Sequence, residues 1–473
     1  MRKSVLHGPA AFELRWSRLS LLRKRRSTTV NRHRKLGRVQ GLTYDRGSVN
    51  DMDDTASCFL RSNGDPVPKI IVAATPVHGH VAPLLTVAAD LVRRGHQVTV
   101  LTGARFKERT EAVGAFFMAL PGEADYDDRR MDQEFPGRSL LPPGPAQLEF
   151  DVKHVFGDPV PAQYEALRRL LTDFPATGVI SDGLFLGALP LSLSSEPGAR
   201  PITISLGISP LPPTGWGSKV HVDAQQHMEA VFESVGVTLS GFALSSLITI
   251  PDHYLQLTIP GFEFPRDDLP SSFHFVGPLP QASVGAFERP SWWEELSDGR
   301  PVVVVTQGTF ANVDLEELVI PTVRVLGDSD ALVVAATARQ GGGMEMRNLM
   351  GSVPSNARLA DFIPFDLLLP FADVLVTNGG YGGVHTALQH GVPLIVGGAT
   401  EDKPLIAALV AWSGSGVNLG TARPDDATLH TAVNAVLSTP SYRTRAQELR
   451  ADFTRFDALE SISELVSSKA DRA

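Results

Sequence analysis

The sequence predicts an α/β protein built from two doubly wound domains of similar size that face a central cleft. Short apolar runs, typical of buried parallel strands, recur along the chain. Helical segments separate these runs at the spacing of βαβ units, whose right-handed crossover implies a parallel sheet. At 473 residues the chain is also long for one core and suits two domains.

The first domain is expected to begin with the apolar run 69–75, which predicts a buried strand. A helical stretch to Arg94 follows, and 97–102 predicts the next strand of a βαβ unit. Two further strands are expected, at 178–181 and 201–206. Segment 121–161 is rich in Pro, Gly and charged residues, so we expect a long irregular excursion on the domain surface.

The second domain is expected to begin at 301–306, a run of four valines between Pro and Thr that predicts a buried strand. Segment 280–300 lacks periodicity and predicts a linker with a short helix at Trp292 and Trp293. Four more strands follow at α/β spacing: 331–337, 358–363, 373–377 and 392–397. We therefore divide the chain into an extension, a first domain, a linker and a second domain whose last helix can return to the first: 1–66, 67–280, 281–300 and 301–473.

Composition is that of a soluble globular protein, with 43% hydrophobic and 20% charged residues. Charge-free stretches such as 234–251 contain too many Ser, Thr and Gly residues to predict a membrane span. The single cysteine, Cys58, excludes an internal disulfide framework and any zinc site made of several cysteines. It suits a reducing compartment, and we expect a cytoplasmic protein.

Charge is distributed unevenly along the chain. Residues 1–46 hold 13 Lys and Arg against Glu13 and Asp45, which leaves 43 − 13 = 30 basic and 52 − 2 = 50 acidic residues in the body. The acidic body argues against nucleic acid as the main partner. The basic head fits a nucleic-acid or membrane arm, an organelle-targeting peptide, or a disordered extension. We favour a disordered extension, or else upstream sequence translated from a wrongly chosen start, with Met52 as the candidate for the real one.

The densest chemical signal is segment 373–393, in which a strand runs into four glycines and a helix is expected to start near Val384. Glycines let the backbone approach a ligand, and the first amides of a helix can hold a diphosphate. The Lys-[Ser/Thr] ending of a P-loop is missing. An ordinary tight turn between strand and helix is the alternative interpretation.

Several motifs carry a family resemblance when taken together. They are Gly-His-Val-Ala-Pro at 79–83, Phe-Ile-Pro at 362–364, the glycine loop at 378–383, Gly-Val-Pro at 391–393 and Glu-Asp-Lys-Pro at 401–404. In order and spacing they resemble the bacterial and plant nucleotide-sugar glycosyltransferases of the GT-B fold, the family that includes macrolide and flavonoid glycosyltransferases. The resemblance spans residues 67–465 and implies that the first domain binds an acceptor and the second a nucleotide sugar.

The resemblance also implies roles for individual residues. His80 matches the catalytic base and Asp182 the acid that orients it. The residues that match the donor site form three groups: Thr309 and the loop Asn378, Gly380, Tyr381, Gly382 and Gly383 at the diphosphate, Phe362 and Ile363 at the nucleotide base, and Asp402 and Lys403 at the sugar hydroxyls. The donor, a UDP- or dTDP-sugar, is a substrate, and no cofactor is expected.

Four positions depart from the family pattern. Asn378 stands for a histidine at the diphosphate, Thr386 for a ribose-binding Glu, Phe365 for a base-contacting Gln, and Lys403 for a Gln at the sugar. Asn378 brings no positive charge, whereas Lys403 adds one. These departures leave the choice between UDP and dTDP, and the identity of the sugar, open.

The chemistry of these residue types agrees with the resemblance. Inverting transfer needs one base for the acceptor hydroxyl, and imidazole suits this because its ordinary pKa is near 6.5. A carboxylate on the other ring nitrogen fixes the tautomer. Helix amides can neutralise the leaving diphosphate, so we expect no metal. Asp328-Ser-Asp330 has the Asp-x-Asp pattern that holds a metal in some glycosyltransferase folds, but it comes just before a strand, and we expect a solvated turn there. The expected partners are a nucleotide sugar and a small hydroxylated acceptor, with no nucleic acid and no membrane insertion.

Other features support weaker predictions. His78 has no evident third ligand for zinc, and His154 and His221 lie in the acceptor half, where we expect surface histidines. Segment 341–343, three glycines, predicts a flexible surface loop. The alternatives are a UDP-sugar epimerase of the same fold, a non-catalytic relative, and an NAD-dependent dehydrogenase. The last would need Gly-x-Gly-x-x-Gly after the first strand, where the chain has Thr-Pro-Val-His-Gly-His.

Overall fold

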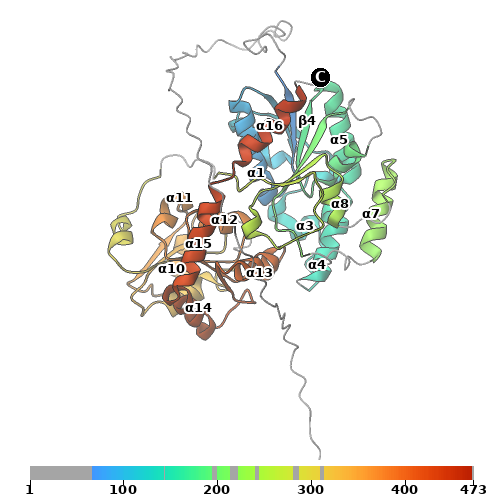
Figure 1. Cartoon of the computed structure of the whole chain (residues 1–473). Coiled ribbons are helices and arrows are strands. Elements are labelled where there is room, and N and C mark those ends of the chain that lie inside the picture. Colours follow the sequence, from blue (N-terminus) through green and yellow to red (C-terminus); the bar gives the residue numbers. More distant parts are fainter. Residues whose placement is uncertain are drawn as a thin grey trace, which may run out of the picture. The chain divides into compact units, whose positions relative to one another are not determined.

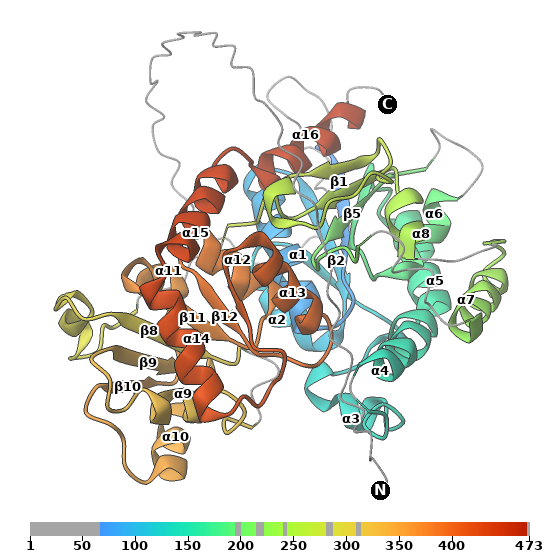
Figure 2. The same ribbon diagram turned by 60° about the horizontal axis from the view of Figure 1, so that its bottom comes forward.

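A computed structural model describes residues 67–142, 144–193, 200–213, 222–239, 244–280, 287–308 and 314–470. These residues form two sheets, of seven and six strands, in which the strands pair in parallel (Figures 1 and 2). The predicted α/β class with two parallel sheets is therefore confirmed. The predicted extension, 1–66, lies outside the described residues.

The first sheet has the strand order β3-β2-β1-β4-β5-β6-β7. Its strands are β1 (Lys69–Ala73), β2 (Gln97–Thr102), β3 (Phe116–Ala119), β4 (Gly178–Asp182), β5 (Ile202–Gly207), β6 (His253–Gln256) and β7 (Phe273–Phe275). Sequence patterning missed β3, β6 and β7. These strands are three or four residues long, and β3 is an edge strand with exposed or half-buried residues, so they lack the continuous apolar run of β1.

Helices cover both faces of the first sheet because successive strand residues point to opposite sides. Ile70 and Val72 of β1 pack with α1 (His78–Arg93), whereas Ile71 and Ala73 pack with α5 (Val160–Asp173). The other helical elements of this domain are η1 (Ala104–Phe106), α2 (Lys107–Ala112), α6 (Leu189–Ser192), α7 (Val222–Ser234) and α8 (Leu244–Thr249), with 3-10 turns at Leu186–Ala188 and Pro260–Phe262.

The prediction of an irregular excursion over 121–161 is wrong. The segment folds into consecutive helical turns, η2 (Gly122–Ala124), η3 (Asp128–Arg130), α3 (Met131–Glu134), α4 (Pro145–Phe150) and the π-helical turn η4 (Asp151–Gly157). A half-buried ion pair fixes it, because both guanidinium Nε and Nη2 of Arg138 donate to the Asp151 carboxylate, at 2.7 and 3.0 Å. Composition alone did not reveal such side-chain pairing.

The second sheet has the strand order β10-β9-β8-β11-β12-β13. Its strands are β8 (Val302–Thr306), β9 (Leu332–Ala336), β10 (Ala357–Ala360), β11 (Val374–Thr377), β12 (Leu394–Val396) and β13 (Gly416–Asn418). Its helices are α9 (Val319–Val325), α10 (Gly342–Met350), α11 (Phe365–Leu368), η9 (Leu369–Phe371), α12 (Tyr381–Gln389), α13 (Lys403–Ser413), α14 (Asp426–Ser438) and α15 (Pro440–Phe453), preceded by η8 (Trp293–Ser297). The valines of β8 alternate between a core with α12, α13 and α15 and a core with α9 and α14.

The last helix, α16 (Ala458–Ala470), packs with the first sheet although it follows the second domain in sequence. Ala458, Ile462 and Val466 are buried in the core that contains β1 and α1. Arg94 Nη1 at the end of α1 donates to Glu460 Oε2 at 2.9 Å, and Figure 1 shows α16 alongside α1. The chain thus crosses between the two sheets twice.

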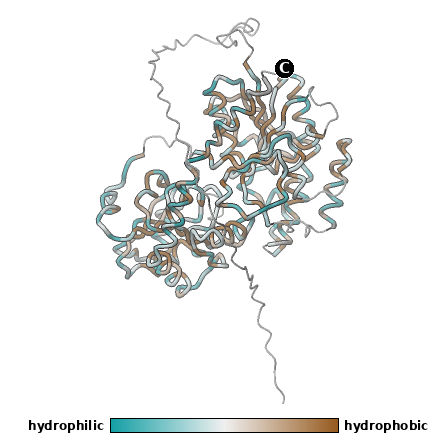
Figure 3. The backbone as a smooth tube through the Cα atoms, viewed as in Figure 1, coloured by the Kyte–Doolittle hydropathy of each residue, from teal (hydrophilic) through white to brown (hydrophobic). Residues whose placement is uncertain are grey.

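The central strands of both sheets are hydrophobic and buried (Figure 3). No helix in the described part of the chain is both long and apolar enough to cross a membrane.

Candidate active site

Each sheet changes its direction of winding at one point, and His80, Asp182 and Asn378 among the predicted site residues lie there. In the first sheet the neighbours β1 and β4 mark this point, and in the second β8 and β11 do so. Helices of an open α/β sheet diverge at such a point, which leaves room for ligands beyond the carboxyl ends of the strands. His80 and Asp182 follow β1 and end β4, whereas Gln307 and Asn378 directly follow β8 and β11.

The structure brings His80 and Asp182 into hydrogen-bond contact, which confirms the predicted pairing. His80 lies in the first turn of α1, and its Nδ1 is 2.8 Å from Asp182 Oδ1. The Asp182 side chain is fully buried, while that of His80 keeps 15% of its surface exposed. A carboxylate at Nδ1 selects the tautomer with hydrogen on that nitrogen, so Nε2 is the atom able to accept a proton.

Backbone groups hold the Asp182 carboxylate in place. The Thr75 amide donates to Oδ2 at 2.7 Å, and the Leu184 amide donates to Oδ1 at 2.9 Å. Burial opposes ionisation of Asp182, but the adjacent His80 and these amides hold the pKa of the carboxyl below its usual value. The carboxylate is therefore charged near neutral pH and can stabilise an imidazolium at His80.

Two aromatic residues near the pair were missed by sequence analysis. Phe156, in η4, stacks on the His80 ring with 6.1 Å between ring centroids. Tyr126 lies after β3 with its hydroxyl buried, and burial followed by the negative charge of Asp182 raises the pKa of that hydroxyl. Neither residue follows a recognisable motif, because both come from the segment predicted to be irregular.

The glycine loop leads into α12, which begins at Tyr381 rather than near Val384 as predicted. Gly380 is the N-cap residue, and no side chain caps the first amides of the helix. A Cβ atom at Gly380 or Gly382 would meet nothing within 4 Å, and one at Gly383 only Phe365, at 3.9 Å. This helix N-terminus thus has free space beside uncapped N–H groups, which is the requirement for binding an anion.

Asn378, which directly follows β11, is buried. Its Nδ2 donates to the backbone oxygen of Gln307, so the loops after β8 and β11 are joined at this point. Gly379, with φ of 91°, has its Cα so close to Val396 that a Cβ would lie 2.5 Å from Cγ1. A glycine is therefore required at position 379 by the packing of the loop against β12. From the sequence alone, this requirement looks the same as a glycine that makes room for a ligand. Thr309 lies outside the described residues.

The two residues predicted to contact the nucleotide base, Phe362 and Ile363, differ in exposure. Phe362 is 50% exposed, whereas Ile363 is buried in the core with α12. Phe365, the departure from Gln, begins α11 and packs partly buried against that same core. Thr386, the departure from Glu, uses its hydroxyl to donate to the Gly382 backbone oxygen at 2.8 Å.

The predicted sugar-contacting residues are engaged with protein groups. Ser209, after β5, donates to Asp402 Oδ2 at 2.7 Å, which links the first domain to the loop before α13. Lys403 Nζ contacts Glu401 Oε2, so its positive charge is paired within the loop. Glu401 has φ of 57°, a left-handed conformation uncommon for a residue with a side chain and often found in ligand-binding loops. Burial raises the pKa of Asp402, partly offset by Ser209 and Lys403.

A buried polar network, also missed by sequence analysis, joins the first domain to α12. Gln256 Nε2 contacts the Ser209 backbone oxygen, Glu263 Oε2 and the Tyr381 hydroxyl at 2.8, 3.0 and 3.4 Å. His385 Nε2 lies 2.8 Å from the Thr258 hydroxyl, and burial lowers the pKa of His385 to about 4. His385 is thus a neutral core histidine that ties α12 to the first domain.

The minor predictions have different outcomes. The Gly341 and Gly343 amides donate to the Asp361 carboxylate at 2.7 and 2.8 Å, so the segment predicted to be flexible is the capped start of α10. Asp328 lies in the turn between α9 and β9, as predicted.

Burial and nearby arginines lower the pKa of His78 to about 4, and its Nδ1 faces Arg109 rather than a metal ligand. His221 lies outside the described residues.

A shallow pocket of about 620 Å³ lies on the second domain, lined by residues such as Ser413, Asn418 and Tyr442. It is at the edge strand β13, and none of the predicted site residues lines it. The candidate active site, with His80 and Asp182, is therefore separate from this pocket.

Comparison with known proteins identifies the chain's relatives. Residues 322–460 match the family model of the erythromycin biosynthesis protein CIII-like C-terminal domain. UDP-glycosyltransferase 2 of Phaeomoniella chlamydospora is 37% identical, over 85% of this chain and 96% of that protein. The 4'-demethylrebeccamycin synthase of Lentzea aerocolonigenes is 37% identical, over 84% of this chain and 98% of that protein. Among solved structures, spinosyn rhamnosyltransferase complexed with thymidine diphosphate has a TM-score of 0.64 at 20% identity, over 84% of this chain and all of that one, and shows the same GT-B fold.

Proposed function

This chain belongs to the UDP-glycosyltransferase family of GT-B enzymes, and from that premise we propose that it transfers a hexose with inversion from a UDP- or dTDP-sugar to a hydroxyl of a natural-product-like small molecule. Membership makes it a nucleotide-sugar-dependent glycosyltransferase. The stereochemistry, the independence from metal and the residue roles described below are our proposal.

The observation that carries the proposal is the contact between His80 and Asp182. A single imidazole that is hydrogen-bonded to a buried carboxylate through one ring nitrogen can accept one proton at the other. Inverting transfer needs one such group, because the acceptor oxygen attacks the anomeric carbon directly. His80 Nε2 takes the hydroxyl proton as the new C–O bond forms and the bond to the diphosphate breaks. Asp182 stabilises the resulting imidazolium.

The donor diphosphate is assigned to the N-terminus of α12. The uncapped N–H groups of Tyr381, Gly382 and Gly383 lie at the positive end of the α12 helix dipole, beside the free space at the glycine loop. Charge-assisted N–H bonds to the leaving diphosphate strengthen as its negative charge grows. We therefore propose that catalysis needs no divalent metal.

The remaining donor contacts follow the family resemblance. Exposed Phe362 is suited to stack on a nucleotide base, and the Ile363 backbone to hydrogen-bond it. Asp402 is proposed to bind sugar hydroxyls by exchanging its Ser209 contact for the sugar. Lys403 contributes little net charge there, since Glu401 pairs with it. Thr309 is proposed to contact the diphosphate.

The test is a product search in the presence of excess EDTA. The enzyme is incubated with UDP-glucose or dTDP-glucose and a panel of hydroxylated aglycones, and products are identified by mass spectrometry. We expect an acceptor plus one hexose, with β configuration by NMR from the α-configured donor. An α-linked product would contradict inversion, and activity restored only by Mg²⁺ or Mn²⁺ would contradict metal independence.

A further inference from the structure

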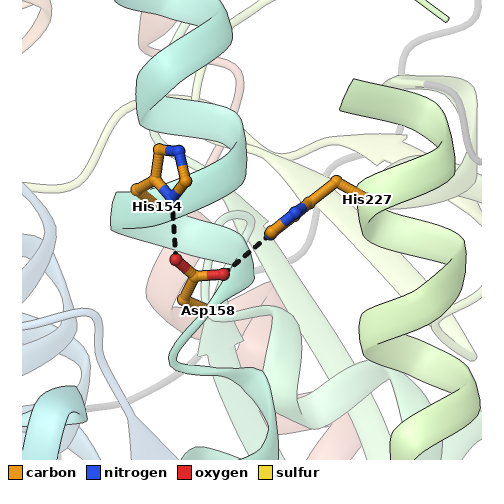
Figure 4. Close-up of side chains that lie close together, drawn as sticks. All are labelled: His154, Asp158 and His227. Atoms are coloured by element: carbon orange, nitrogen blue, oxygen red, sulfur yellow. Dashed lines mark hydrogen bonds and ion pairs between the residues drawn. The ribbon is translucent and has the colours of Figure 1, made fainter. Parts of the chain in front are cut away.

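Three side chains with metal-binding groups meet on the helices of the first domain, apart from the catalytic pair. His154 lies in η4, Asp158 follows it by four residues, and His227 is in α7. Asp158 stands between the two rings: His154 Nδ1 is 2.8 Å from Oδ2, and His227 Nε2 is 2.7 Å from Oδ1 (Figure 4). One ligand atom of each residue lies within 4.8 Å of the others.

The donor set matches a borderline divalent cation. Two imidazole nitrogens and one carboxylate oxygen are ligands that Zn²⁺ prefers, and three protein ligands leave one position for water. Calcium and magnesium would require a largely oxygen shell. Side-chain exposures of 37%, 39% and 30% for His154, Asp158 and His227 give an ion access to the group. Among the described residues this is the only group of three His, Cys, Asp or Glu that satisfies the distance.

Packing of the backbone holds the three ligands together. Gly157 lies between His154 and Asp158, and a Cβ there would be 2.7 Å from Met228 Sδ and 2.9 Å from the Val152 oxygen. Only a glycine therefore lets η4 approach α7 at this point, next to His227. The Phe150 ring, 4.6 Å from that of His154, limits the directions the imidazole can take. A π-helical turn of this kind is rare and is often found at functional sites.

We propose that His154, Asp158 and His227 bind a zinc-class divalent cation that clamps α7 to the π-helical turn η4. A neutral imidazole can move its hydrogen to the outer ring nitrogen, so the nitrogens that now face Asp158 become free to bind the ion. Phe156, two residues from His154, stacks on His80, so the clamp fixes the turn that supports the base. The ion takes no part in sugar transfer. Without it, the hydrogen bonds of Asp158 hold the same three residues.

Isothermal titration of the metal-free full-length protein with ZnCl₂ tests the clamp. We expect one equivalent bound at micromolar free zinc by the wild type and a rise of a few degrees in melting temperature. His227→Gln and Asp158→Asn should each lose that equivalent. His430→Gln is the matched control, because it removes an exposed histidine of α14 and should bind zinc as the wild type does.

Substitution of Co²⁺ provides an independent readout. Visible absorption bands of low-symmetry, four-coordinate Co²⁺ should appear in the wild type and in His430→Gln and be absent from His227→Gln. Zinc stoichiometry that is unchanged in both His227→Gln and Asp158→Asn would overturn the proposal. So would the absence of zinc binding by the wild type, which would show that the three residues form a hydrogen-bond network only.

Discussion

At the residue scale, the pair His80 and Asp182 was predictable from the family motifs, since His80 stands in the motif after the first buried strand and Asp182 ends another buried strand. Their contact follows from the pairing of β1 with β4, which sets Ala73 beside Ser181. The surroundings of the pair were not predictable. Phe156 and Tyr126 reach the site through side-chain packing between segments far apart in sequence, for which a single sequence holds no local signal.

Replacing Asp182 with Asn tests the role of the carboxylate as a positioning group. The amide keeps the shape but loses the charge that fixes the tautomer of His80 and stabilises its imidazolium. We expect kcat to fall by about 10²–10⁴, with the nucleotide affinity unchanged. Steady-state kinetics and calorimetry with UDP measure the two quantities. Wild-type kcat in the variant would remove Asp182 from the mechanism.

The buried Glu263 predicts how stability depends on pH. Burial raises the pKa of this carboxyl to about 7 from an ordinary 4.5, with backbone donors partly opposing the shift. Between these values the unfolded chain releases a proton that the folded protein retains, so the folded state loses stability as the pH rises from about 4.5 to 7. The loss is of the order of 3 kcal/mol, at about 1.4 kcal/mol per pH unit.

Glu263→Gln should therefore raise the free energy of unfolding relative to wild type more at pH 8 than at pH 5. Urea denaturation at the two pH values measures this difference. The exposed Glu288→Gln serves as the control and should show the wild-type pH dependence. An identical pH dependence in Glu263→Gln and wild type would contradict the assignment of the raised pKa.

At the element scale, the long apolar strands and the glycine loop could be located from the sequence, since hydrophobic runs and glycine clusters are local signals. The short strands β6 and β7 and the helical turns of 121–161 could not, because pairing with neighbours rather than apolar pattern defines them. The start of α12 was misplaced by three residues. Glycines at its first turn favour a loop by propensity, but packing of Tyr381 and Val384 in the core selects the helix.

Gly383→Val tests the N-terminus of α12 as the diphosphate site. The added side chain enters free space beside the helix, where its Cβ meets only Phe365 at 3.9 Å, so the fold should tolerate it. We expect loss of UDP and dTDP binding by calorimetry, with an unchanged melting temperature. Gly383→Ala, which is smaller, should retain part of the affinity. Wild-type nucleotide affinity in Gly383→Val would mean that the diphosphate binds elsewhere.

At the scale of the whole molecule, the two sheets are linked in two ways. Helix α16 joins the core of the first sheet, as the domain division allowed. Gln256, Thr258 and Ser209 contact residues of the second domain, which the domain division did not anticipate. The donor loops thus rest on the domain that carries His80. The spacing of apolar runs and helical segments predicted the two-domain architecture, whereas these contacts depend on three-dimensional packing.

The central claim, that His80 is the base of a nucleotide-sugar glycosyltransferase, is tested most directly by His80→Ala in the complete enzyme. Donor binding by calorimetry and transfer rate by product mass spectrometry are measured on the same preparation. We predict nucleotide affinity equal to that of the wild type and a transfer rate lower by about 10²–10⁴. Transfer at the wild-type rate by His80→Ala would contradict the account.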